Sequence, residues 1–104
     1  MTTIDNIYDL LHLLFDVLSD EYTEKVINGE YLNDTIKVTK QGSTNAMYIG
    51  FDLKYPDVIN ATVYDEPENY DERDDCPVAE GIFWDTEDPK LTPETIAADI
   101  KKYL

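Results

Sequence analysis

The chain has 104 residues, a length typical of one domain with one hydrophobic core. Its 23 acidic and 8 basic residues give a formal net charge of -15. This charge argues against direct binding to nucleic acid or to an anionic membrane, and it favours basic protein partners. The hydrophobic fraction of 42% is in the globular range, so a disordered chain is not expected.

The start of the chain and its only cysteine suggest a cytoplasmic protein. Cys76 has no second cysteine to pair with, so no internal disulfide is expected. The first residues lack the basic region of a secretory signal. The longest apolar-rich run, residues 10–18, is too short to span a bilayer and is interrupted by His12 and Asp16.

The first predicted element is a helix over residues 3–18, where apolar residues recur at helical spacing. They are Ile4, Ile7, Tyr8, Leu11, Leu14, Phe15 and Leu18. Leu10, Leu13 and Val17 widen this apolar face. The helix is therefore expected to be deeply packed, or to offer a second face to a partner.

Residues 19–34 allow two interpretations. The first, which we favour, is a short helix or an irregular link that stops at Asn28–Gly29. The second is a hairpin in which Asn28–Gly29 is the turn between Tyr22–Ile27 and Glu30–Leu32. Acidic residues, which are uncommon in strands, argue for the first: Asp20, Glu21 and Glu24.

Four strands are predicted from alternating apolar residues and turn signals. They are Thr35–Lys40, Met47–Tyr55, Val58–Tyr64 and Val78–Trp84. The first two should form a hairpin across residues 41–45. The side chains expected to face inward on the second strand are Met47, Ile49, Phe51, Leu53 and Tyr55.

A second helix is predicted over Pro93–Tyr103. Thr92 is expected to cap it, and Leu91 is expected to pack against Ile96. The whole chain, residues 1–104, is thus interpreted as one α+β domain. The expected architecture is a two-layer sandwich of an N-terminal helix, a four-stranded antiparallel meander and a C-terminal helix.

The acidic residues are concentrated in two parts of the chain. Residues 65–88 hold eleven acidic residues and one arginine, and residues 1–34 hold eight and one lysine. Tyrosines stand among the carboxylates of the first group, where they could supply contact area in an interface. The candidate partner-binding residues are Tyr64, Asp65, Glu66, Glu68, Tyr70, Asp71, Glu72, Asp74 and Asp75, with Asp5, Asp9 and Asp16 on the first helix. The alternative is a surface whose acidity serves only solubility.

Three features could carry chemistry, but each has a plainer interpretation. Asp9, His12 and Asp16 share a helix face, which is more typical of a solvated polar stripe than of a metal site. The acidic run 71–75 lacks the glycine and the spaced ligands of a calcium loop. Cys76 lies among carboxylates, which make a thiol a poor nucleophile. No catalytic residue, metal or cofactor is therefore expected, and the chain is interpreted as a non-enzyme.

The leading functional hypothesis is an inhibitor that occupies the basic surface with which a partner protein binds nucleic acid. On the first helix, Asp5, Asp9 and Asp16 are separated by roughly 6 and 10 Å along the axis, about two and three phosphate steps. In size and charge, the chain resembles the small DNA-mimic proteins that phages and mobile elements use against restriction, CRISPR or repair enzymes. It also resembles acidic antitoxins that neutralise basic nucleases. It carries no family motif, so the resemblance implies no residue roles.

Two other hypotheses remain. The chain could be an adaptor or subunit of a cytosolic complex that binds through an apolar helix face. It could also be an enzyme built on His12 and its neighbouring aspartates. Salt-sensitive partner binding would favour the inhibitor, and salt-insensitive binding the adaptor. Full activity of a His12→Ala variant would exclude the enzyme.

Overall fold

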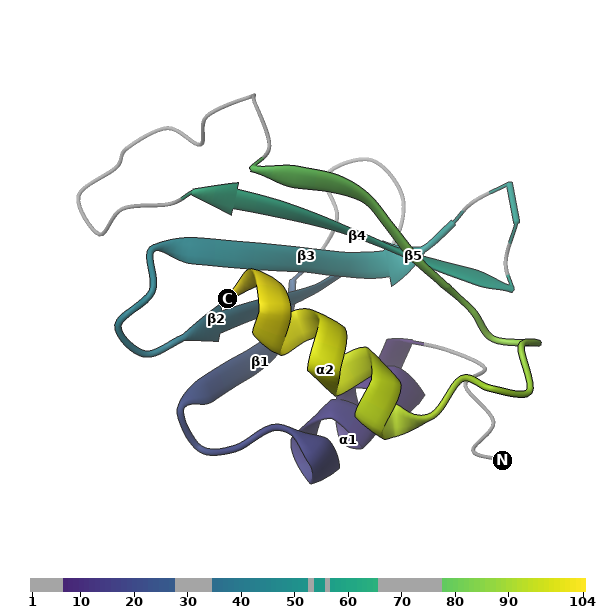
Figure 1. Cartoon of the computed structure of the whole chain (residues 1–104), viewed down its shortest axis with the longest axis horizontal. Helices are drawn as coiled ribbons and strands as arrows, with labels where there is room; N and C mark the ends of the chain where they lie inside the picture. Colours follow the sequence, from purple (N-terminus) through teal and green to yellow (C-terminus); the bar gives the residue numbers. More distant parts are fainter. Residues whose placement is uncertain (1–6, 28–34, 53, 56, 66–77) are drawn as a thin grey trace.

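A computed structural model of the chain describes residues 7–27, 35–52, 54–55, 57–65 and 78–104. This part of the chain forms a helix, five strands and a second helix, in that order (Figure 1). Their bounds are α1 Ile7–Val17, β1 Tyr22–Ile27, β2 Thr35–Lys40, β3 Asn45–Phe51, β4 Val58–Asp65, β5 Ala79–Asp85 and α2 Pro93–Tyr103. The predicted α+β class is confirmed, but the sheet has one strand more than the four expected.

The strands form one antiparallel sheet in the order β1-β2-β3-β4-β5, so each pairs with its neighbour in sequence. The predicted hairpin of β2 and β3 is confirmed, with Ile36 opposite Ile49. Gly42, in the turn between these strands, has a φ of 86°. Glycine suits that turn because a side chain strains the backbone at positive φ.

The additional strand is β1, so the favoured interpretation of residues 19–34 as a helix or an irregular link is wrong. The alternative placed a strand at the same residues, Tyr22–Ile27, but its partner is β2. Asn28–Gly29 and Glu30–Leu32 lie outside the described residues. The strand forms because Tyr22 is buried and Val26 packs against the core, and these contacts outweigh one glutamate.

Strand β3 ends at Phe51, earlier than the predicted end at Tyr55. The Oδ1 atom of Asp52 accepts hydrogen bonds from the backbone N–H groups of Lys54 and Tyr55, at 2.8 and 3.0 Å. These bonds turn the chain, as aspartate side chains commonly do. Met47 and Ile49 are buried as predicted, whereas Tyr55 is 57% exposed.

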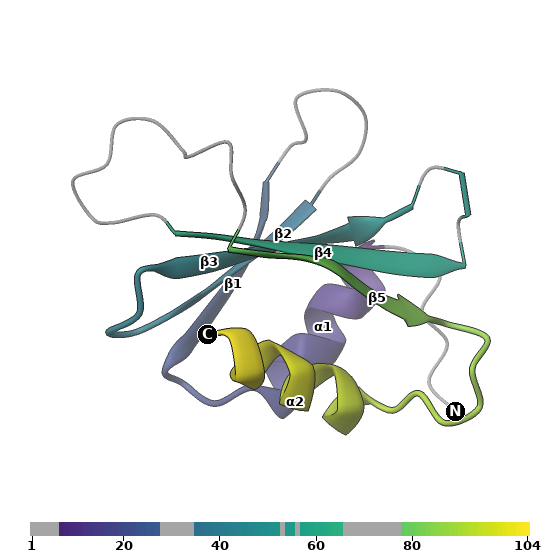
Figure 2. The same cartoon turned by 45° about the horizontal axis from the view of Figure 1, so that its top comes forward.

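Both helices lie on the same side of the sheet (Figure 2). Leu10 and Leu14 of α1, and Ile96 and Ile100 of α2, are fully buried. They belong to one core with apolar side chains of the strands, including Ile36, Val38, Met47, Ile49, Ile59, Val63 and Trp84. Among the described residues no polar or charged side chain is buried. Hydrophobic burial therefore holds the layers together, and the charge lies outside the core.

The predicted start of α2 is confirmed. Thr92 accepts a hydrogen bond from the backbone N–H of Thr95 at 3.2 Å, and Pro93 is the first helical residue. Leu91 packs against the core that contains Ile96. For α1, the helix predicted over residues 3–18 is confirmed from Ile7 to Val17, and Leu18 lies just beyond its end.

Strand β5 contains a bulge. Ala61 stands opposite Ile82 and Val63 opposite Ala79, so Glu80 and Gly81 together face the single residue Thr62. Gly81 has a φ of 75°, which suits glycine at such a position. This edge of the sheet is therefore irregular, whereas β1 at the other edge pairs with β2 in an unbroken register.

Candidate functional site

The structure describes four of the twelve predicted partner-binding residues. Asp9 and Asp16 lie on α1, and Tyr64 and Asp65 end β4. The others, Asp5, Glu66, Glu68, Tyr70, Asp71, Glu72, Asp74 and Asp75, lie outside the described residues. The structure does not bring Tyr64 together with the aspartates of α1. Its neighbour Val63 faces the helices, so Tyr64 points from the opposite face of the sheet.

Tyr64 belongs to an aromatic group on that opposite face. Its ring meets the ring of Tyr48 edge-on, with the ring centres 5.6 Å apart. The ammonium group of Lys37 lies 5.7 Å from the centre of the Tyr48 ring. Both tyrosines are partly buried. Tyr64 therefore stabilises the surface of the sheet through a neighbour on the adjacent strand.

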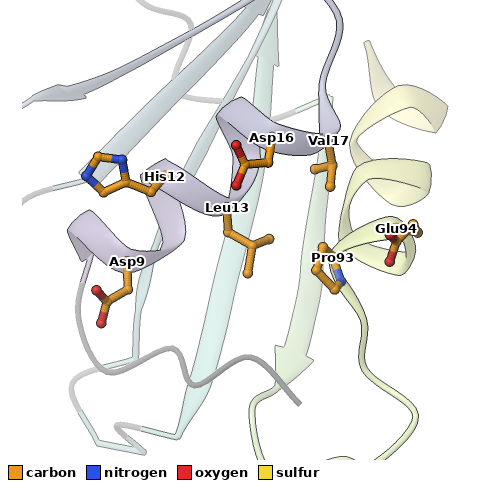
Figure 3. Close-up of a pocket in the computed structure, with 7 residues that line it drawn as sticks. All are labelled: Asp9, His12, Leu13, Asp16, Val17, Pro93 and Glu94. Carbon is orange, nitrogen blue, oxygen red and sulfur yellow. The ribbon is translucent and has the colours of Figure 1, made fainter.

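The polar stripe of α1 lines a groove that sequence spacing alone did not reveal. Asp9, His12 and Asp16 border it from α1, and Glu94 borders it from the first turn of α2 (Figure 3). Leu13, Val17 and Pro93 supply its apolar part. The groove encloses about 430 Å³. Glu94 lies beside the aspartates because α1 and α2, which are far apart in the sequence, pack side by side.

The polar side chains that line this groove do not point toward a common centre. The side chains of Asp9, His12 and Asp16 spread in different directions along α1 (Figure 3). The ring of His12 meets that of Phe15 edge-on at 6.3 Å. Within the described ranges, no three His, Cys, Asp or Glu side chains are grouped so as to hold a metal ion. The three polar side chains of α1 therefore line the groove without meeting at one point.

A second group of carboxylates gathers where two turns meet. The backbone carbonyl of Asp57, between β3 and β4, accepts hydrogen bonds from the N–H and the hydroxyl of Thr86, at 2.9 and 2.8 Å. Asp85, at the end of β5, stands opposite Val58. We call Asp57, Asp85, Glu87 and Asp88 the acidic ridge, and all four are exposed. None of the four is among the candidate residues predicted from the sequence, although a meander places the start of β4 beside the end of β5.

Part of the acidic ridge also shapes the backbone. The side chain of Asp85 accepts a hydrogen bond from the N–H of Glu87 at 2.9 Å, and that of Asp88 accepts one from the N–H of Lys90 at 2.9 Å. These are ordinary turn interactions. They hold two carboxylates in fixed positions while leaving them exposed.

The second apolar face of α1 is not the one that the sequence indicated. Leu10 and Leu13 are buried, so they cannot meet a partner. Tyr8 and Phe15 are 54% and 50% exposed, and Leu11 is partly buried between them. We call Tyr8, Leu11 and Phe15 the outer stripe. Its signal is present in the sequence, since the three residues share one side of the helix at i, i+3 and i+7.

In the part of the chain that the structure describes, no helix has the length and apolar character needed to cross a membrane. Comparisons with protein-family models, curated proteins and solved structures found no match.

Proposed function

We propose that the protein is an acidic protein-binding module of the cytoplasm, which inhibits a basic partner by occupying its nucleic-acid-binding surface. An inhibitor of this kind would be a DNA-mimic, anti-defence or immunity/antitoxin protein. The main observation in favour of this function is the net charge of -15, together with the exposure of most of the described carboxylates. Those that are exposed are Asp16, Asp20, Glu21, Asp57, Asp65, Glu80, Asp85, Glu87, Asp88 and Glu94.

The physical basis is electrostatic complementarity. A protein that binds phosphates does so with lysine and arginine, and exposed carboxylates offer those side chains an alternative partner. Such attraction speeds association and weakens as salt screens it, over a length of about 10 Å at 0.1 M ionic strength. The acidic ridge supports the proposal further, because backbone hydrogen bonds hold two of its carboxylates in place before any partner arrives.

The proposal is tested by capturing partners from host lysate on the immobilised protein and eluting them with a salt gradient. We expect a basic nucleic-acid-binding protein that elutes at moderate salt and that duplex nucleic acid displaces. Elution that does not depend on salt, or capture that nucleic acid does not compete with, would contradict the proposal.

Three variants would locate the binding surface on that partner. One neutralises the acidic ridge by changing its Asp and Glu residues to Asn and Gln. The second neutralises the groove residues Asp9, Asp16 and Glu94. The third neutralises Asp71, Glu72, Asp74 and Asp75. A defined interface should depend on one set far more than on the others, whereas a purely solubilising charge would give equal and small losses.

A second candidate function is an adaptor that binds through apolar contacts. The observation in its favour is the outer stripe, because two large aromatic side chains of one helix are half exposed. Partner binding that persists at high salt and is lost on changing Tyr8 and Phe15 to serine would support this function.

A further inference from the structure

Strand β1 is an open edge of the sheet in the part of the chain that the structure describes. It pairs with β2 on one side, and no described strand pairs with it on the other. The backbone N–H of Gln41 donates to the carbonyl of Glu21 at 2.8 Å. In an antiparallel ladder hydrogen-bonded pairs alternate, so Thr23, Lys25 and Ile27 are the strand residues that bond to β2. The backbone polar groups of Glu24 and Val26 therefore point away from β2, toward the outside of the sheet.

The outer stripe of α1 lies beside this edge. Helix α1 packs against β1 and β2, whereas α2 packs against β3 (Figure 1). Leu13 and Val17 face α2, where they line the groove with Pro93. Successive helix residues are rotated by about 100°, so Tyr8, Leu11 and Phe15 lie on the side of α1 that faces away from α2. The stripe therefore borders the space beyond β1.

Glu24 adds a charge to this place. Its neighbours Thr23 and Lys25 are exposed on the other face of the sheet, and Tyr22 and Val26 pack on the helix side. Strand alternation thus directs the side chain of Glu24 to the helix side. It is partly buried there, and burial raises its pKa. The carboxylate interacts with the backbone N–H of Glu24 itself, and a cation placed opposite it on an added strand would offer it a charged partner instead.

We propose that the edge of β1 and the outer stripe together accept an extended segment of the partner protein as an added strand. The segment carries apolar side chains against Tyr8, Leu11 and Phe15, and a lysine or arginine opposite Glu24. Its backbone pairs with the outward groups of Glu24 and Val26, the usual mode of strand addition at a sheet edge. The inference rests on the proposed function only for the basic character of the segment.

Charge argues against a second copy of the chain as the occupant. Two copies at -15 repel each other. A symmetric antiparallel pair of β1 strands centred on Glu24 or on Lys25 would place like charges directly opposite each other, which destabilises a sheet. A partner segment with a single cation opposite Glu24 reverses the sign of that contact.

The probe is a capped peptide, Thr-Val-Thr-Lys-Thr-Val-Thr, titrated into the isotope-labelled protein and followed by NMR. We expect saturable shifts of the Glu24 and Val26 amides, slower hydrogen exchange at both, and shifts of the Phe15 ring. A peptide with glutamate in place of lysine should bind about two- to fivefold more weakly, the range of a cross-strand charge pair.

Two changes separate strand addition from simple charge attraction. Glu24→Pro removes one outward N–H group while leaving the bonds to β2 intact, and it should abolish saturable binding. Glu24→Gln is the matched control, since it removes the charge but keeps the N–H, and should weaken binding only about two- to fivefold. On the unchanged protein, the peptide Thr-Pro-Thr-Lys-Thr-Pro-Thr has the same charge but lacks the two N–H groups that would bond to Val26 and Tyr22, so it should not protect the β1 amides.

Equal binding of the proline-containing peptide, or no saturable shift of the β1 amides, would overturn the inference. A protein dimer that Glu24→Pro dissociates would overturn it too, because the second copy would then be the occupant. The proposed function fails separately, if the captured partners are not basic or not salt-sensitive. Peptide binding at β1 would survive that result.

Discussion

The indole nitrogen of Trp84 donates a hydrogen bond of 2.8 Å to the Oδ2 atom of Asp99, which joins β5 to α2. Trp84 is 4% exposed, so its N–H has little access to water. Asp99→Ala would leave this donor without its partner, and should lower the free energy of unfolding by about 1–3 kcal/mol. Urea unfolding would measure the loss. Asp99→Asn, which keeps an acceptor oxygen, should lose less; equal stability of the alanine variant would contradict the assignment.

The two sides of α1 should respond differently to truncation. Leu10 is fully buried, so Leu10→Ala should cost about 2–5 kcal/mol of stability. Phe15 is half exposed, so Phe15→Ala should change stability by no more than about 0.5 kcal/mol. Chemical unfolding of both variants checks this contrast. A Phe15→Ala variant as unstable as Leu10→Ala would mean that the outer stripe belongs to the core.

Glu24 should lower stability at neutral pH. Burial raises its pKa above the usual 4.5, so the unfolded chain holds the carboxylate form more easily than the folded chain does. The cost is full above the folded pKa and is absent below about 4.5. Glu24→Gln should therefore have the higher melting temperature at pH 7, with the difference vanishing toward pH 4. A difference that grows as the pH falls would show the opposite linkage.

Asp52 should have the opposite pH dependence. Its carboxylate accepts hydrogen bonds from the side chain of Asn60 and the backbone of Tyr55 and Lys54, and these lower its pKa below 3.8. The stabilisation is present above pH 3.8 and is lost as the pH falls through the lowered folded pKa. Asp52→Ala should thus melt earlier at pH 7, and the gap should close in strong acid.

Asp57→Ala is the matched control for this turn. The hydrogen bonds that Thr86 makes to Asp57 use the backbone carbonyl, which alanine retains. The Asp57→Ala variant should therefore melt close to the unchanged protein at every pH. Equal losses in the two variants would remove the special role of the Asp52 side chain.

Salt should stabilise the protein. With a net charge of -15, the folded chain repels itself, and added ions screen exposed charges beyond about 10 Å at 0.1 M. Thermal melts in increasing sodium chloride should show a rising midpoint that levels off at moderate concentration. A midpoint that does not change would mean that the acidic residues are too far apart to repel each other significantly.

The strands and helices that the sequence predicted well are those whose signals are local. Thr92 and Pro93 mark the start of α2 by their chemistry, and the alternation around Met47 and Ile49 marks β3. Strand β1 is hard to predict because most of the acidic residues that argue against a strand lie before it rather than in it. Asp20 and Glu21 precede the strand, and only Glu24 lies in it.

The candidate site was less predictable because it depends on contacts between distant residues. Spacing along one helix correctly placed Asp9, His12 and Asp16 on one face, but no spacing relates them to Glu94. The same holds for Asp57 and the residues after Asp85, which meet through strand pairing. Exposure was also misassigned on α1, since widening an apolar face does not reveal which part of it packs.

The bulge at Glu80 and Gly81 limits what the sheet can build. A chain that extends other sheets at both of its edges can stack without end, as in fibres. Here the β5 edge is broken by an extra residue, while the β1 edge is regular. A strand added at β1 would therefore extend the sheet at that edge only, because the irregular β5 edge does not favour a further strand. Complexes formed through β1 should be closed, with one partner segment for each copy of the protein.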